Sequence, residues 1–256
     1  MTDHAYSLDE FVLTVMTLMK LGLLDCGEMP AEWLAEHGSF AQWFIPFLNK
    51  AGQTINFQIY DVLHGEIPAH PDVCDAWLIT GSADSVYDDL DWLNTLKAFL
   101  RQTIKQQPIV GICFGHQLLH HLLGGRVERS SQGWCIGTHH YQVIQQTDWM
   151  QPQAATFDLL ASHQDQVIEP APDSVTLAQS TSCPIAMSVF GDYAVSMQPH
   201  PELLTGLAEK VFRYRRDEQG HKVTDQALAS LTTPLSDTLA AQWIINFLNG
   251  TQIRER

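Results

Sequence analysis

The chain has 256 residues, with 29 acidic residues against 14 Lys and Arg and a formal net charge of −15. This length suffices for one large α/β domain that buries most of its apolar surface. The excess of acidic residues argues against a nucleic acid partner, because binding a phosphate backbone depends on clustered Lys and Arg. The five cysteines form no Cys-x-x-Cys pair, and their odd number suits free thiols in a reducing compartment. We therefore expect a cytoplasmic protein without a disulfide framework, structural zinc or cofactor.

Residues 1–18 precede the expected fold. Ser7 to Glu10 has the pattern of a capping box before the apolar run Phe11 to Leu18, which predicts a short helix. The run is too short to span a bilayer, and acidic rather than basic residues precede it. We therefore expect neither a signal peptide nor a membrane anchor, but an extension of the fold, which begins near Met19.

Strand and helix patterns then alternate as far as Gly111. The expected elements are a buried strand at Leu21 to Leu24, an amphipathic helical pattern from Trp33 to Phe47, strands at Ile55 to Tyr60 and Ala76 to Ile79, a helix from Asp91 to Gln106, and an apolar strand from Pro108 to Val110. Such alternation implies right-handed crossovers and a parallel sheet covered on both faces. The loops after the strands would then open at one edge.

The pattern changes between Arg126 and Val195, where short alternating segments predict antiparallel strands added to the core. Helices are expected again at Pro201 to Arg216, with the proline in the first helical position, at Asp225 to Leu231, and at Leu235 to Leu248. The predicted fold is a three-layer, flavodoxin-like α/β fold with a mostly parallel central sheet, flanking helices and an added antiparallel segment. We expect a single domain over residues 19–250 and a tail at 251–256.

One cysteine lies at a predicted turn between a strand and a helix, in Gly111-Ile112-Cys113-Phe114-Gly115-His116-Gln117. Glycine two residues to either side allows the close backbone approach that such a sharp turn needs. On the first turn of a helix, the macrodipole and unpaired N–H groups favour a thiolate and can also bind an oxyanion. The alternative is a buried cysteine that only packs.

A thiolate nucleophile needs a base and a group that orients the base. His200 lies in Gln198-Pro199-His200-Pro201-Glu202, after a predicted strand at Tyr193 to Ser196, and Glu202 is close enough to hold its imidazole in one tautomer. The alternative is an ordinary helix N-terminus, in which the Glu202 carboxylate faces the dipole.

Three segments together carry a family resemblance: Gly111 to Gln117, Gln198 to Glu202, and Thr80-Gly81-Ser82. In their order along the chain they resemble the class I (triad) glutamine amidotransferase family, and in particular stand-alone members related to the glutaminase domain of GMP synthase. The resemblance covers nearly everything from Lys20 to Leu248. It implies that Cys113 attacks the side-chain amide of glutamine, expelling ammonia and leaving a γ-glutamyl thioester. His200 would be the general base and then the acid, and Glu202 would orient it.

The resemblance also implies the remaining site residues. Backbone amides of Phe114 and of the Gly81-Ser82 loop would hold the oxyanion, and Gln117 would contact bound substrate. Ser162, His163, Gln164 and Asp165 would recognise the amino and carboxylate groups of the substrate. A carboxylate such as that of Asp165 suits an ammonium group, although Asp165 as a loop cap is the alternative. The loop departs from the family pattern, since Ala83 stands where relatives often have proline.

Two further clusters have ordinary interpretations. His116 and His120 have the i, i+4 spacing of metal ligands, with His121 beside them, but no acidic or third ligand is obvious nearby, so packing and surface roles are expected and no metal. Arg213, Arg215 and Arg216 form a basic patch at the expected end of a helix. Complementation of the helix dipole is the default interpretation, and docking of a partner is the alternative.

Three functions fit this pattern. The first is glutamine hydrolysis, with the ammonia passed to a separate synthetase or acceptor protein, because no synthetase module follows the last expected helix. The second is a γ-glutamyl peptidase that acts on glutathione-like compounds, since plant γ-glutamyl peptidases resemble this group and share the Phe-Gly-His-Gln turn. The third is a regulatory or binding homologue with weak turnover, which an intact triad argues against.

Overall fold

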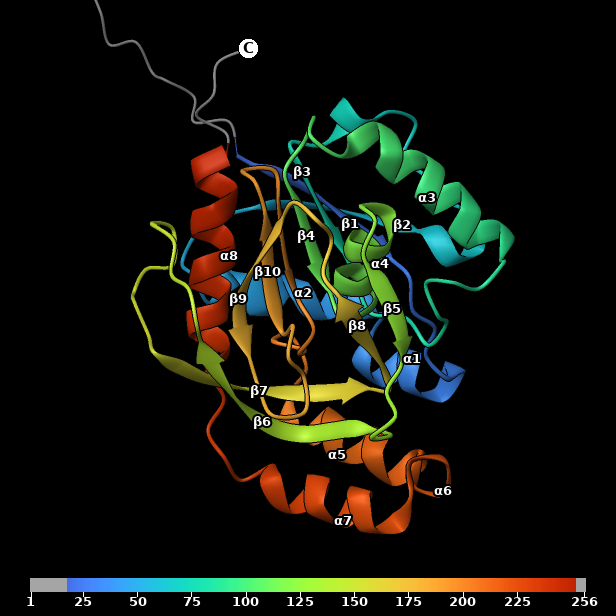
Figure 1. Ribbon diagram of the computed structural model, residues 1–256. Coiled ribbons are helices and arrows are strands. Elements are labelled where there is room, and N and C mark those ends of the chain that lie inside the picture. The colour runs from blue at the N-terminus through green and yellow to red at the C-terminus, as the bar shows by residue number, and fades with distance from the viewer. Residues whose placement is uncertain (1–17, 252–256) are drawn as a thin grey trace, which may run out of the picture.

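The computed structural model of this chain describes residues 18–251 (Figure 1). The expected N-terminal extension, apart from Leu18, and the tail after Thr251 lie outside the described residues, so the short helix predicted before Met19 is not described. The first strand begins at Lys20, next to the expected start of the fold.

Within the described residues, most strands belong to one large sheet. The strands are β1 (Lys20–Asp25), β2 (Asn56–Asp61), β3 (Ala76–Ile79), β4 (Ile109–Ile112), β5 (Arg126–Arg129), β6 (Cys135–Val143), β7 (Thr156–His163), β8 (Asp165–Glu169), β9 (Ser174–Gln179), β10 (Met187–Phe190) and β11 (Ala194–Met197). The large sheet has the order β2-β1-β3-β4-β11-β10-β9-β6-β7, and β5 and β8 form a separate pair.

The large sheet has a parallel part and an antiparallel part. Strands β2, β1, β3, β4 and β11 form parallel pairs in this order, whereas β10, β9, β6 and β7 continue the sheet beyond β11 with antiparallel pairs. Strands β3 and β4 read AWLI and IVGI and are buried at every position, as expected for parallel strands covered on both faces. The predicted α/β fold with an added antiparallel segment is confirmed.

In the described part of the chain, helices lie between the strands of the first half and follow the last strand. They are α1 (Ala31–His37), α2 (Phe40–Asn49), α3 (Asp91–Thr103), α4 (Phe114–Leu122), α5 (Thr205–Tyr214), α6 (Arg216–Gln219), α7 (His221–Ser230) and α8 (Asp237–Thr251), with 3₁₀ turns η1 (Val62–His64) and η2 (Pro71–Val73). Figure 1 shows β6 and β7 crossing one end of the molecule, with α5, α6 and α7 beyond them. This end therefore adds a layer to the sheet and its flanking helices.

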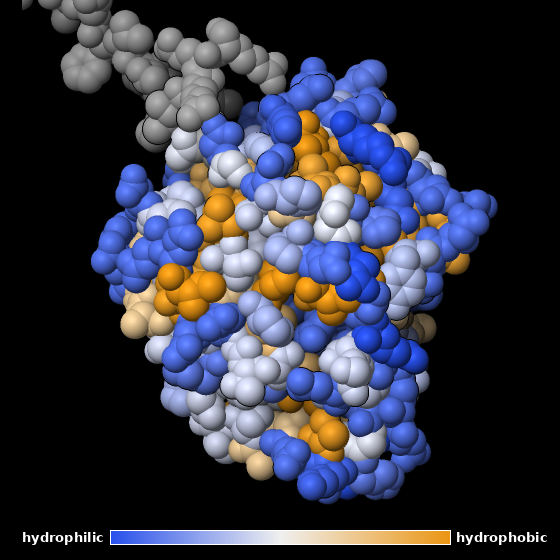
Figure 2. Space-filling view, in the orientation of Figure 1, coloured by the Kyte–Doolittle hydropathy of each residue, from blue (hydrophilic) through white to orange (hydrophobic). Residues whose placement is uncertain are grey.

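The face drawn in Figure 2 is mainly hydrophilic, and its hydrophobic residues form small separate areas. Hydrophilic side chains are thus spread over the surface in this view. Over residues 18–251, none of the helices is both long and apolar enough to cross a membrane.

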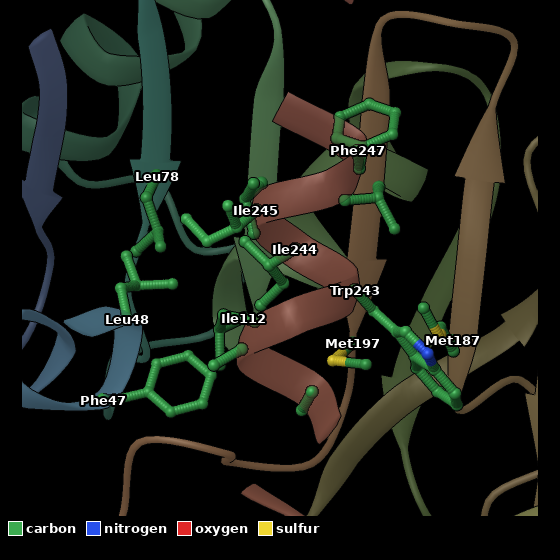
Figure 3. Close-up of a cluster of buried hydrophobic side chains, with 14 of the residues drawn as sticks. Phe47, Leu48, Leu78, Ile112, Met187, Met197, Trp243, Ile244, Ile245 and Phe247 are labelled. Atoms are coloured by element: carbon green, nitrogen blue, oxygen red, sulfur yellow. The ribbon is translucent and has the colours of Figure 1, made fainter. Parts of the chain in front are cut away.

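Apolar side chains fill both sides of the sheet. One buried cluster joins α2 and α8 to the sheet, and in Figure 3 Phe47 of α2, Ile112 of β4 and Ile244 of α8 point into it. A second cluster joins α3 and α4 to the sheet, including Leu96 and Leu118. Each such side chain contributes roughly 1.5–3 kcal/mol on burial. The two clusters fix the sheet against its helices and hold the ends of the parallel strands in place.

The expected helix from Pro201 to Arg216 is wrong in its start and its end. Helix α5 begins only at Thr205, so Pro201 is not in a first helical position, and α6 is a separate turn of helix. A tertiary contact explains the late start of the helix. The backbone N–H of His200 donates a hydrogen bond to the carbonyl oxygen of Leu160 in β7, with a nitrogen–oxygen distance of 2.7 Å. The segment around His200 is therefore extended, and its interpretation as an ordinary helix N-terminus is also wrong.

Candidate active site

Cys113 lies at a strained turn between β4 and α4. Its backbone has φ 52° and ψ −101°. Residues other than glycine rarely adopt this conformation, because it costs them about 1–3 kcal/mol. A Cβ on Gly111 would lie 2.5 Å from the carbonyl oxygen of Gly115, and a Cβ on Gly115 would lie 2.5 Å from that of Ile79. The two glycines that flank the cysteine are therefore required by close backbone contacts, as the sequence predicts.

The sulfur of Cys113 lies beside groups that can stabilise negative charge. Cys113 is the N-cap of α4 and is only 5% exposed. Phe114 is the first residue of that helix, so its N–H has no acceptor within the helix. A Cβ on Gly81 would lie 3.9 Å from the Cβ of Cys113 and 3.0 Å from Cε1 of His200. The loop after β3 is thus packed against the cysteine and the histidine, where the sequence places an oxyanion loop.

His200 and Glu202 form a buried hydrogen-bonded pair. The distance between His200 Nδ1 and Glu202 Oε1 is 2.7 Å, and both side chains are buried. Burial alone would lower the pKa of His200, but the charges and hydrogen bonds of Cys113 and Glu202 outweigh it, so the pKa lies well above its usual value. This arrangement favours the protonated form of the imidazole, and Glu202 holds the ring in one orientation.

A chain of amide groups joins the cysteine to the far wall of the site. The Nε2 group of Gln198 donates to the sulfur of Cys113 at 3.5 Å. The Nε2 group of Gln117 donates to Gln198 Oε1 at 3.1 Å and to the backbone oxygen of Asp165 at 2.8 Å. No role was predicted for Gln198. The sequence could have indicated this role, because residues i and i+2 of an extended segment share a face. This spacing places Gln198 on the same side as His200.

A cavity of about 110 Å³ opens onto the cysteine. The residues predicted for the site that line it are Ser82, Cys113, Gln117, Ser162, His163, Gln164 and Asp165, and the additional lining residues are Ala83, Asp84, Ser85, Arg129, Trp134, Arg215 and Glu218. The other predicted residues, Gly81, Phe114, His200 and Glu202, do not line it but adjoin Cys113 directly or through His200. The structure therefore brings all the predicted site residues into one region.

Asp165 is held at the cavity wall by a residue far away in the sequence. Its Oδ2 accepts a hydrogen bond from Ser85 Oγ at 2.6 Å, which is not the local contact of a loop cap. Its backbone oxygen also faces Nδ1 of His163 at 3.0 Å. Burial lowers the pKa of His163 to about 3, so this ring is neutral at pH 7. The His163 ring therefore adds no positive charge to this wall.

The histidines of α4 are packing residues. His116 Nδ1 lies 2.7 Å from Ser196 Oγ, and His120 Nε2 lies 3.0 Å from Ser188 Oγ. His116 and His120 are buried, and His121 is partly exposed. In the part of the chain that the structure describes, no group of three His, Cys, Asp or Glu side chains is placed to hold a metal ion.

The arginines at the end of α5 are each paired with a carboxylate. Arg213 bonds to Glu209 and Arg216 to Asp225. Arg215 bonds to Glu218 at 2.9 Å and lies 4.7 Å above the ring of Trp134, where it lines the cavity. The predicted basic patch is thus a set of ion pairs, and one of its members belongs to the candidate site.

Sequence comparisons find relatives of this chain among known proteins. The family model described as glutamine amidotransferase class-I matches residues 36–214. Gamma-glutamyl peptidase 5 of Arabidopsis thaliana is 27% identical over 229 residues, which cover 84% of this chain and 89% of that protein. The glutamine-hydrolyzing GMP synthase of Bacillus velezensis is 34% identical over 128 residues, 49% of this chain and 24% of the synthase.

Solved structures show the same fold. A glutamine amidotransferase from Thermotoga maritima superimposes with a TM-score of 0.68 at 17% identity, over 93% of this chain and 100% of the other. A glutamine amido transferase from Methylobacillus flagellatus gives the same TM-score at 21% identity, over 93% of this chain and 96% of the other. At these identities the likeness supports the architecture of the sheet and its helices.

Proposed function

Because this chain belongs to the class-I glutamine amidotransferase family, we propose that it cleaves the γ-glutamyl amide of glutamine through a thioester on Cys113. The observation that carries the proposal is the cluster at the strained turn, where Cys113 meets His200 and the latter is held by Glu202 at 2.7 Å. A buried imidazole with a raised pKa beside a thiol is suited to thiolate attack and to proton transfer.

In the first half of the proposed reaction, the thiolate of Cys113 attacks the γ-carbonyl carbon of the substrate. The carbonyl oxygen becomes an oxyanion, which the N–H of Phe114 and the loop at Gly81 and Ser82 would hold. Each such donor contributes roughly 3 kcal/mol to transition-state stabilisation. The imidazolium of His200 gives its proton to the leaving nitrogen, so that ammonia departs and the glutamyl group stays on sulfur.

In the second half, water replaces the departed amine. His200, now neutral, takes a proton from the water as it attacks the thioester carbon. The carbon–sulfur bond breaks, glutamate leaves, and the thiolate and imidazolium are restored. Glu202 keeps Nδ1 of the ring protonated and thereby directs Nε2 toward the reaction in both halves.

A second candidate function is cleavage of γ-glutamyl peptides by the same chemistry. The specific observation in its favour is the extent of the likeness, since gamma-glutamyl peptidase 3 of Arabidopsis thaliana is matched over 90% of its length. GMP synthases are matched over about a quarter of theirs. The two functions share the glutamyl head of the substrate and differ only in the group that leaves with nitrogen.

The two candidates imply different partners. Glutamine hydrolysis that supplies ammonia needs a separate synthetase or acceptor protein, whereas peptide cleavage needs none. The five cysteines are free thiols, which supports a reducing compartment such as the cytoplasm.

The test is a direct comparison of substrates with the purified chain. Ammonia release from L-glutamine and amine release from γ-glutamyl peptides would be measured side by side, and mass spectrometry of rapidly quenched enzyme should find one glutamyl group on Cys113. The Cys113→Ala variant should form no adduct and turn over neither substrate. Inert wild-type enzyme, or a variant that keeps its activity, would refute the proposal. Labelling of Cys113 by a glutamine-like electrophile no faster than an ordinary thiol would instead favour a binding homologue.

A further inference from the structure

The separate strand pair β5 and β8 places two opposite charges beside each other at the cavity. Arg129 of β5 is directly opposite Asp165 of β8, and on the same ladder Val127 is opposite Val167. Residues two apart on a strand share a face, as do residues directly opposite across a ladder. Arg129 and Asp165 therefore lie on the same face as the buried Val127 and Val167, at the end of the strand pair, where Asp165 is partly buried and Arg129 is exposed. Both residues line the cavity that contains Cys113.

These two charges do not neutralise each other. The carboxylate of Asp165 accepts a hydrogen bond from Ser85 Oγ, and the ion pairs found over residues 18–251 include none to Arg129. The other cation of the cavity, Arg215, is held by Glu218 and by the ring of Trp134. Arg129 is therefore the cavity cation of the described chain that has no carboxylate partner.

The head of a glutamyl compound carries an ammonium and a carboxylate on the same carbon. Side chains directly opposite in an antiparallel pair begin roughly 5 Å apart, so an ammonium and a carboxylate on one carbon can meet an acid and an arginine on neighbouring strands. We propose that Arg129 binds the α-carboxylate of the substrate while Asp165 binds its α-ammonium group. This inference rests on the proposed function, since it names the residue that selects the head of the substrate.

The proposal defines a substrate class. Compounds with a free α-amino group and a free α-carboxylate on the γ-glutamyl unit are accepted, whatever amine leaves. Amides that lack the α-carboxylate lose the contact with Arg129, which is a charge-assisted hydrogen bond. Arg129 thus determines specificity for the head and takes no part in the chemistry at Cys113.

The experiment measures binding apart from turnover. In a Cys113→Ala background, calorimetry would give the affinity for L-glutamine and for 4-aminobutyramide, which is glutamine without its α-carboxylate. Adding Arg129→Ala should weaken L-glutamine binding by roughly 10- to 100-fold, as expected for loss of a hydrogen bond to a charged group. It should leave 4-aminobutyramide binding unchanged, and Arg129→Lys should recover part of the loss.

Arg126→Ala is the matched control. Arg126 lies on the same strand, is exposed, bonds to Glu128 and Glu169, and does not line the cavity, so this variant should bind L-glutamine as the parent does. An unchanged affinity for L-glutamine in Arg129→Ala, an equal loss for both compounds, or no binding of L-glutamine by the Cys113→Ala parent would overturn the inference. Normal binding by that parent with no turnover by the wild type would refute the proposed function alone.

Discussion

The side-chain amide of Gln198 donates a hydrogen bond to the sulfur of Cys113, with a nitrogen–sulfur distance of 3.5 Å. Gln198 is fully buried, and Gln117 fixes its orientation by donating to its carbonyl oxygen. A donor held in this way stabilises a thiolate more than a thiol, because hydrogen bonds to charged groups are the stronger ones. The sulfur is thus supported from the side of Gln198 as well as by the helix and the imidazole.

This relationship predicts the effect of removing the donor. Gln198→Leu should lower kcat by roughly 10- to 100-fold, as expected for the loss of a hydrogen bond to a charged group, with little change in KM. Alkylation of Cys113 by iodoacetamide at pH 7 should slow in parallel. Gln142→Leu changes an exposed glutamine of β6 and should alter neither rate. Unchanged alkylation in Gln198→Leu would show that the amide does not support the thiolate.

The strained backbone at Cys113 predicts opposite effects on activity and stability. Cys113→Gly and Cys113→Ala should both be inactive, but the glycine variant should have the larger free energy of unfolding, by about 1 kcal/mol, because glycine adopts a positive φ without strain. Denaturant unfolding of the two variants measures this difference. Cys183 is buried and has no positive φ, so it serves as the control. There the alanine variant should have a larger free energy of unfolding than the glycine variant. A less stable Cys113→Gly would mean that the turn stores no strain.

The buried pair of His200 and Glu202 predicts a change in titration. Glu202→Gln removes one of the causes that raise the pKa of His200, so this pKa should fall, and kcat should drop roughly 10²- to 10⁴-fold. NMR titration of the ring and steady-state kinetics would check both. Asp158→Asn, which removes the acid of the exposed His140–Asp158 pair, should leave activity unchanged.

The same raised pKa affects stability in a defined direction. A histidine whose folded pKa lies above its unfolded value of about 6.5 contributes stability that is complete below that pH and is lost as pH rises through the folded pKa. In Glu202→Gln this loss should occur at lower pH and be smaller. Unfolding curves between pH 6 and 9 that are parallel for the two proteins would contradict this account of His200.

The buried His120 predicts sensitivity to acid. Burial lowers the pKa of His120 to about 4, so the unfolded chain binds a proton near pH 6.5 while the folded chain resists it. Between pH 7 and pH 5 this residue should reduce the free energy of unfolding by about 2 kcal/mol. His120→Gln should be less stable at pH 7, since Ser188 and the N–H of Ala171 lose their partner, but its stability should fall less on acidification. Equal slopes for the two proteins would count against a neutral, buried His120.

Local patterns in the sequence were enough to predict the layers of the fold and the turn at Cys113. Apolar runs such as those of β3 and β4 predict strands covered on both faces, and the glycines at 111 and 115 predict close backbone contacts that the structure contains. These features depend on residues near one another in the chain. The predicted helical start at Pro201 failed for the opposite reason, since the N–H of His200 bonds to Leu160, forty positions earlier.

What the sequence by itself determined is therefore the alternation of strands and helices and the chemical identity of the groups at 113, 200 and 202. Only the tertiary structure decided which side chains surround them, because the partners come from separate strands. Gln198 reaches Cys113 through the parallel pairing of β11 with β4, and Arg129 meets Asp165 through the register of β5 with β8. Pairing and register depend on contacts between residues far apart in the chain, and no local pattern specifies them.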